Sequence, residues 1–195
     1  MRRLQFIMVA AAASALAACQ SPIAPRSLDE PGAAVVGGSA VGGPSAAANG
    51  GGHYLLQNAF DTQFAFSATE NDGGVHGQLH VQLTAGGVAI GFRGRVTCVS
   101  VDPINRRAWI GGVITENLSE DPAFQTARHQ PGHDIWFRVL DSGEGADAPP
   151  DRTSFTGFEG DLMIPTSAEY CRQQPWADGN ARTWPVTEGN IQVRP

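Results

Sequence analysis

The stretch VHGQLHVQLTAGGVAIGFRGRVTCVS, from Val75 to Ser100, decides the fold. Large apolar residues alternate with polar or small residues in both of its halves, which is the pattern of an extended chain with one buried face. The small residues Ala85-Gly86-Gly87 divide the two halves and are typical of a hairpin turn. The stretch therefore predicts two neighbouring antiparallel β-strands.

The two faces of this predicted hairpin differ in chemistry. One face carries Val75, Leu79, Val81, Leu83, Val88, Ile90, Phe92, Val96 and Cys98. The opposite face carries His76, Gln78, His80, Gln82, Arg93, Arg95 and Thr97. We therefore expect Cys98 to point into the core. His76 and His80 would lie about 13 Å apart along a strand, which is too far to share one metal ion, so they are expected on a solvated face.

The same alternation recurs along the chain and predicts about seven strands. The further stretches are Phe60–Thr69, Arg107–Thr115, Asp134–Asp141, Arg152–Phe158 and Asn190–Arg194. Helix is scarce, with short helices expected only within 118–129 and 166–174. We therefore predict an all-β domain, a single antiparallel β-barrel or sandwich, with the chain-terminal stretch as the closing strand.

The N-terminal region has the pattern of an export signal. Arg2 and Arg3 precede an apolar run, Leu4 to Ala18, that is too short to span a membrane as a helix. Leu16-Ala17-Ala18-Cys19 resembles the bacterial lipobox. This resemblance implies that residues 1–18 are a signal peptide, and that Cys19 carries diacylglycerol and a further acyl chain such as palmitate. A plain signal peptide with an incidental Cys19 is the alternative.

The predicted location follows from this signal. Two or more acyl chains hold a protein stably on a membrane that it does not span. Gln20 follows the cysteine, and in Gram-negative lipoproteins a non-acidic residue there resembles the outer-membrane pattern. We therefore expect an exported protein of the cell envelope that is anchored by lipid, in the outer membrane if the host is Gram-negative.

Composition divides the mature chain into two parts. Residues 19–52 are mostly Gly, Ala, Ser and Pro, and such a stretch buries too little apolar surface to offset the entropy of ordering. We expect a lipidated Cys19 followed by a disordered tether to residue 52. Residues 53–195 are the predicted β domain, at a usual domain size.

The charge of the mature chain excludes one class of partner. All 13 basic residues are arginine, and loss of Arg2 and Arg3 leaves 11 against 19 acidic residues, a net charge of −8. Nucleic-acid binding needs clustered positive charge, so no nucleic-acid partner is expected. The remaining candidates are the membrane through the anchor and a protein, glycan or apolar ligand.

The two other cysteines, Cys98 and Cys171, lie in a chain that the signal sends to a disulfide-permissive compartment. We expect them to form one structural disulfide, which the loop-entropy model makes worth about 4 kcal/mol. A buried pair of free thiols and a redox couple are the alternatives, although the spacing is unlike C-x-x-C.

The strongest metal candidate is the stretch DSGEGADAPPD, which holds Asp141, Glu144, Asp147 and Asp151. Calcium takes six to eight oxygen ligands, which clustered carboxylates and turn carbonyls can supply. The alternative is a long turn that these residues only shape. A weaker candidate is the pair His129 and His133, which a Pro-Gly turn brings close; a polar loop is its alternative.

Trp109 and Trp136 are candidates for a ligand-binding surface. They fall on the faces opposite Ile110 and Ile135, so they lie outside the core if these isoleucines lie inside it. A second sheet, a helix or a loop covering that face is the alternative.

Four short stretches resemble a family of exported bacterial β domains without an assigned activity. They are Gly94–Asp102, Ala108–Thr115, Phe137–Asp151 and Glu188–Val193. The resemblance implies a small all-β domain with a disulfide from its central strand to a later cysteine, and no catalytic residue.

The chain shows no G-x-S-x-G motif and no lysine for a Ser-x-x-Lys arrangement. The sequence therefore favours a non-enzymatic envelope lipoprotein with a binding or structural β domain. A calcium-dependent binding module and a hydrolase are the alternatives.

Overall fold

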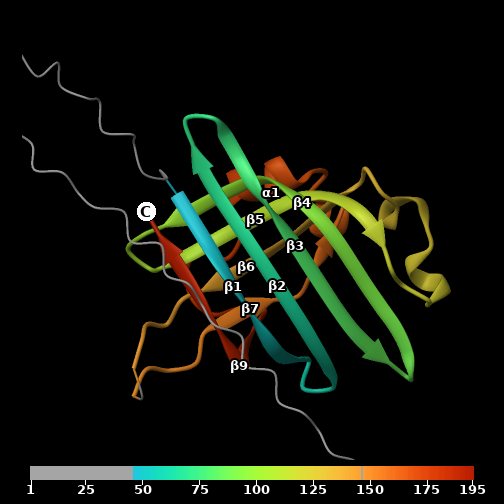
Figure 1. Ribbon diagram of the computed structural model, residues 1–195, viewed down its shortest axis with the longest axis horizontal. Coiled ribbons are helices and arrows are strands. Elements are labelled where there is room, and N and C mark those ends of the chain that lie inside the picture. Colours follow the sequence, from blue (N-terminus) through green and yellow to red (C-terminus); the bar gives the residue numbers. More distant parts are fainter. Residues whose placement is uncertain (1–45, 146) are drawn as a thin grey trace, which may run out of the picture. The chain divides into compact units, whose positions relative to one another are not determined.

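Nine β-strands and one short α-helix make up most of the structure, a computed structural model that describes residues 46–145 and 147–195. The strands are β1 (Ala46–Leu56), β2 (Phe60–Asn71), β3 (Gly74–Ala85), β4 (Val88–Asp102), β5 (Arg107–Asn117), β6 (Asp134–Leu140), β7 (Arg152–Ser154), β8 (Gly157–Phe158) and β9 (Thr183–Arg194). The helix is α1 (Ser167–Gln173), and the 3₁₀ turns are η1 (Pro122–Phe124), η2 (Ala127–His129) and η3 (Asp161–Met163). Figure 1 shows the strands wrapped around one core, with α1 outside them.

The strands close into a barrel. Strands β1 to β5 form an antiparallel meander, and β5 pairs with β6. The circle continues from β6 through β7 to β9, which returns antiparallel to β1, while β8 pairs only with β6. The result is an eight-stranded closed antiparallel barrel with one extra strand. The all-β prediction is confirmed. Of the barrel and the sandwich that the prediction left open, the structure is the barrel.

Strand β1 overturns the predicted boundary between tether and domain. It begins at Ala46, so residues 46–52 belong to the sheet rather than to the tether. Its glycines suit a strand that β9 approaches closely, because a Cβ on Gly50 would lie 2.6 Å from Asn190 O and one on Gly52 would lie 2.0 Å from Glu188 O. The rest of the predicted tether, with the signal peptide, lies outside the described residues.

Large apolar side chains fill the barrel. An eight-stranded barrel is just wide enough for side chains to occupy its interior. Phe66 packs edge-on against Phe137, with ring centroids 5.2 Å apart, and stacks near Phe64. The buried cluster also includes Tyr54, Leu79, Val81, Ile90, Val96, Val99, Ile110, Ile114, Ile135, Val139, Ile191 and Val193.

A β-bulge in β4 reverses the predicted direction of Cys98. Val96 pairs with Gly112 and Cys98 with the adjacent Gly111, so Thr97 is an extra residue in the ladder. An inserted residue shifts the alternation that follows it. Val99 therefore joins the core, and Cys98 points out of the barrel towards α1. The expectation that Cys98 points inward is wrong for this reason.

One side of the barrel carries an outer layer built on α1. Thr166 caps this helix by accepting a hydrogen bond from Glu169 N at 3.2 Å, as Thr does at helix N-termini. The helix confirms the expectation for 166–174, whereas 118–129 forms the turns η1 and η2 instead of a helix. No helix in the described part of the chain is long and apolar enough to cross a membrane.

Candidate functional site

The outer face of β2, β3 and β4 contains a hollow of about 810 Å³. Its lining includes the polar residues Ser67, His76, Gln78, His80, Arg93 and Arg95. We call this feature the outer hollow. Its volume lies within the range of small-molecule sites, about 300–1,000 Å³.

The strand register brings these polar residues together. Ser67 of β2 pairs with Gln78 of β3, which pairs with Arg95 of β4. The next outward-facing row joins Ala65, His80 and Arg93 in the same way. The side chains of β2 in both rows are small, so the polar side chains of β3 and β4 border open space.

Two glycines in the lining lie where neighbouring strands approach each other closely. Gly77 has φ +152°, and a Cβ there would lie 1.9 Å from Ser67 O, so no other residue fits without moving the backbone. A Cβ on Gly94 would lie 3.0 Å from Val113 O. These close backbone approaches fix glycine at two positions in the lining.

Every titratable residue in the lining of the outer hollow is an arginine or a histidine. The Arg93 Nη1 lies 2.8 Å from the Glu116 Oε2, and both side chains are about half exposed. The side chain of Arg95 is exposed and makes neither a hydrogen bond nor an ion pair within the described residues. The outer hollow therefore holds one compensated and one uncompensated guanidinium.

His80 contributes a polar atom without a partner. Its Nε2 is buried and makes no hydrogen bond within the described residues. A buried polar atom normally has a partner, and leaving it without one costs about 1–3 kcal/mol. A bound water or ligand would supply the missing bond. The sequence predicted that His76 and His80 share the outer face but did not predict the hollow around them.

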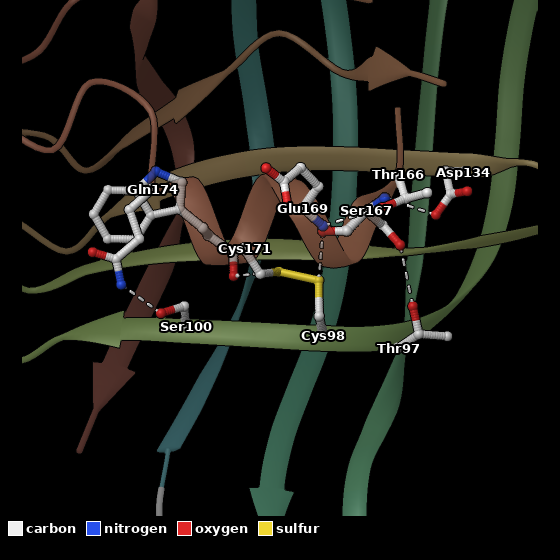
Figure 2. Close-up of a disulfide and its surroundings, with 10 residues drawn as sticks. Thr97, Cys98, Ser100, Asp134, Thr166, Ser167, Glu169, Cys171 and Gln174 are labelled. Carbon is white, nitrogen blue, oxygen red and sulfur yellow. Dashed lines mark hydrogen bonds between the residues drawn. A yellow bond between two sulfur atoms is a disulfide. The ribbon is translucent and has the colours of Figure 1, made fainter. Parts of the chain in front are cut away.

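The second predicted feature, the disulfide, lies on another part of the wall. Cys98 and Cys171 are bonded, with Cα atoms 6.2 Å apart, and they join β4 to α1. Figure 2 shows the bond between the helix and the strand beneath it. The Ser167 N donates to Asp134 Oδ1 at 2.7 Å at one end of the helix, and the Gln174 Nε2 donates to Ser100 Oγ at 2.6 Å at the other. The prediction of a structural disulfide is confirmed.

The two tryptophans predicted as a ligand surface are covered. Trp109 is 0% exposed and Trp136 is 1% exposed, and they form an outer cluster with Ile164 and Tyr170. Trp136 stacks on Tyr170 of α1 with ring centroids 5.6 Å apart, and the Trp109 Nε1 donates to Pro175 O at 3.0 Å. The alternation correctly placed both rings outside the barrel. The ligand-surface prediction is wrong because α1 and the loop after it cover them.

A buried arginine holds that loop down. Arg138 follows Trp136 on the same outer face of β6 and is 1% exposed. Its Nη2 donates to Ala181 O at 2.7 Å, and its Nη1 donates to Trp176 O. Burial lowers the pKa of its guanidinium below the ordinary value. The cover thus combines apolar packing with charge-assisted hydrogen bonds.

Two of the predicted calcium ligands, Asp141 and Asp151, instead accept hydrogen bonds from backbone amides. The Asp151 carboxylate accepts from Ser142 N at 2.8 Å and Ile191 N at 2.7 Å. The Asp141 carboxylate accepts from Gly143 N at 2.8 Å and Val193 N at 3.1 Å. Burial raises the pKa of Asp151, more than its backbone hydrogen bonds lower it.

These contacts join the loop to β9, and the other two carboxylates, Glu144 and Asp147, are exposed. The Glu144 Oε1 accepts from Asn190 Nδ2 at 3.3 Å. No three His, Cys, Asp or Glu residues within 46–145 and 147–195 are grouped so that they could hold a metal ion. The calcium prediction is wrong, because the oxygens of Asp141 and Asp151 face backbone amides.

His129 and His133, the weaker metal candidate, each contact other residues. His129 is buried against the rings of Phe92, Phe124 and Phe158, and its Nδ1 lies 2.9 Å from Thr126 Oγ1. The His133 Nδ1 lies 2.8 Å from Glu159 Oε2. His129 therefore helps to close the barrel core rather than to bind a metal. Cys19, the predicted lipidation site, lies outside the described residues.

No family model, no curated protein and no solved structure matches this chain. The resemblance to exported β domains therefore stays a prediction.

Proposed function

We propose that this protein is a non-enzymatic, lipid-anchored protein of the bacterial cell envelope whose barrel domain binds a ligand or partner. The observation that carries the binding role is the outer hollow, an open depression on a closed barrel in which a few polar side chains border an otherwise apolar lining. Small-molecule sites combine a concave surface with a few placed polar groups.

The anchor is supported by the sequence at Cys19. An apolar run with a basic start precedes Leu16-Ala17-Ala18-Cys19, and Gln20 follows. The disulfide between Cys98 and Cys171 is compatible with export, since disulfides persist in oxidising compartments. The proposed location is the outer membrane if the host is Gram-negative.

The non-enzymatic role is supported by how the chain uses its reactive groups. Both cysteines of the domain are bonded to each other, and Asp141 and Asp151 accept backbone hydrogen bonds. Aromatic and aliphatic side chains occupy the barrel interior, where a ligand or substrate would otherwise sit, apart from an apolar cavity of about 100 Å³ beside Tyr54, Ile90 and Phe92. The open polar surface is the outer hollow, where binding without covalent chemistry is the simplest use.

The anchor is tested by replacing Cys19 with Ser in cells that are fed labelled palmitate. We expect the parent protein to be labelled and to stay with the membrane fraction, because two or more acyl chains anchor stably. The variant should lose the label and appear in the soluble fraction. Retention of the unlabelled variant on the membrane would contradict lipid anchoring.

A further inference from the structure

We propose that the outer hollow binds the anionic group of a small ligand, a carboxylate or a phosphate, and that Arg95 is its main contact. The proposal names the ligand class for the binding role proposed above and rests on that role, but it does not depend on the lipid anchor.

The charge of the outer hollow is opposite in sign to that of the whole chain. The whole chain has a formal charge of −6. The outer hollow nevertheless collects His76, His80, Arg93 and Arg95 and includes no Asp or Glu in its lining. A depression lined by charge of one sign concentrates ligands of the opposite sign. An acidic protein with a basic depression is therefore suited to hold a small anion there.

The two arginines of the outer hollow differ in their ion pairing. Arg93 is held by Glu116 at 2.8 Å, which fixes its position beside the outer hollow and compensates its charge. Arg95 lies two residues along the same face of β4, and its guanidinium has no hydrogen-bond or ion-pair partner within the described residues. A guanidinium presents N–H groups in a fork that matches two oxygens of a carboxylate or phosphate. Arg95 is thus free to bind such a group.

The ring of His80 has a buried nitrogen without a hydrogen-bond partner. Its neighbours in the row are Ala65, which offers no polar group, and Arg93, which offers only donors in its side chain. Its buried Nε2 has no partner. An oxygen of a bound anion or of a water that the anion orders would accept from the ring when that nitrogen carries a proton. His80 is therefore the second expected contact, and Gln78 lies between it and His76 on the chain.

Small residues on β2 leave the space open. Ala65 and Ser67 are the β2 residues of the two outward-facing rows, opposite His80 and Gln78. They leave the polar side chains of β3 and β4 uncovered. The outer hollow is therefore set by the size of these β2 residues and not by one side-chain conformation.

The test is isothermal titration calorimetry of the purified protein with inorganic phosphate and, separately, with citrate. An ionic strength of about 0.01 M keeps screening weak, since the Debye length is then about 30 Å. We expect saturable binding of at least one anion at millimolar concentration or below. Binding of phosphate but not citrate would identify a phosphate site, and the reverse would identify a carboxylate site.

Two matched variants locate the site. Arg95→Gln removes the proposed main contact, and we expect it to weaken binding about tenfold or more, as loss of a hydrogen bond to a charged group does. Arg194→Gln makes the same change of charge on β9, where the side chain bonds Gln192 and, within the described residues, no other group. It should leave the affinity within about twofold, because Arg194 does not line the outer hollow and a distant exposed charge interacts only weakly through water. His80→Gln should weaken binding by a smaller factor than Arg95→Gln.

The following outcomes would overturn the proposal. No heat and no saturation with either anion, in protein that melts cooperatively, would show that the outer hollow is not an anion site. An equal loss of affinity in Arg95→Gln and Arg194→Gln would show diffuse attraction instead of a site. Membrane retention of Cys19→Ser bears only on the anchor, so failure of the two proposals can be told apart.

Discussion

The two outer walls of the barrel differ in what the chain does with their outward-facing residues. On β5 and β6 these residues include Trp109 and Trp136, and a helix, a loop and a disulfide cover them completely. On β3 and β4 they are His76, His80, Arg93 and Arg95, and no described segment covers them. The apolar wall has become a second core, and the basic wall stays open. Stability and binding are therefore expected to depend on different walls.

The largest expected effect is on the covered wall. Trp109→Ala removes a fully buried ring and its hydrogen bond to Pro175 O. We expect the free energy of unfolding to fall by about 3–5 kcal/mol, the usual cost of truncating a buried Trp. Urea unfolding followed by fluorescence measures it, with Arg95→Gln as the control, because an exposed unpaired side chain usually changes stability by less than about 0.5 kcal/mol. Equal losses in both variants would contradict the division between the walls.

The next effect is the loss of the bond that fixes the cover. The double variant Cys98→Ser/Cys171→Ser should lower the free energy of unfolding by about 2–4 kcal/mol, because the unfolded chain is no longer constrained. It should also make the outer cluster more accessible, since α1 is then held by packing and hydrogen bonds alone. Hydrogen exchange of the α1 amides and of the β3 amides measures the two walls separately.

We expect faster exchange in α1 and little change in β3. Dithiothreitol added to the parent protein should reproduce the loss of stability in the double variant, and should leave the double variant itself unchanged. Equal increases of exchange in α1 and β3 would show that the disulfide supports the whole barrel and not its cover.

The sequence predicted the parts of this comparison that depend on local alternation. It placed His80 and Arg93 on the outer face and Trp109 opposite Ile110, because side-chain direction in a strand follows from a period of two. It named a covering helix or loop as the alternative for Trp109 but could not choose it, since the cover comes from distant residues such as Pro175, 66 positions later in the chain. It likewise left barrel and sandwich open, because closure depends on the distant pairing of β9 with β1.

The errors have specific physical causes. Thr97 is an extra residue in the ladder, and a bulge of this kind leaves no clear mark in a Val-Thr-Cys-Val run, so Cys98 was placed on the wrong face. Residues 46–52 have the composition of a linker, although their glycines serve close contact with β9. Asp141 and Asp151 have the residue types of a calcium loop, but their oxygens are taken by amides of β9. The residue types indicated which oxygens could bind a ligand, but not which backbone amides occupy those oxygens.

The smallest expected effect concerns a third covered surface, the ring cluster around His129. Burial lowers the pKa of this imidazole below its ordinary value, and the nearby Arg128 lowers it further. The folded state therefore disfavours the protonated ring relative to the unfolded state. Its contribution to stability is present above the unfolded pKa of 6.5 and is lost as the pH falls through the lower, folded pKa.

This pH dependence can be isolated with His129→Gln, which cannot be protonated. We expect the free energy of unfolding of the parent protein to fall more steeply below pH 6.5 than that of the variant. Urea unfolding at a series of pH values measures the difference between the two slopes, and His133→Gln is the control because that ring is exposed beside Glu159. The steeper fall of the free energy of unfolding below pH 6.5 could instead be lost in His133→Gln and kept in His129→Gln. In that case His129, the ring packed among Phe92, Phe124 and Phe158, is not the group that titrates. A slope carried by His129 would mean that this end of the barrel loosens on acidification while the Trp109 cover, which contains no histidine, does not.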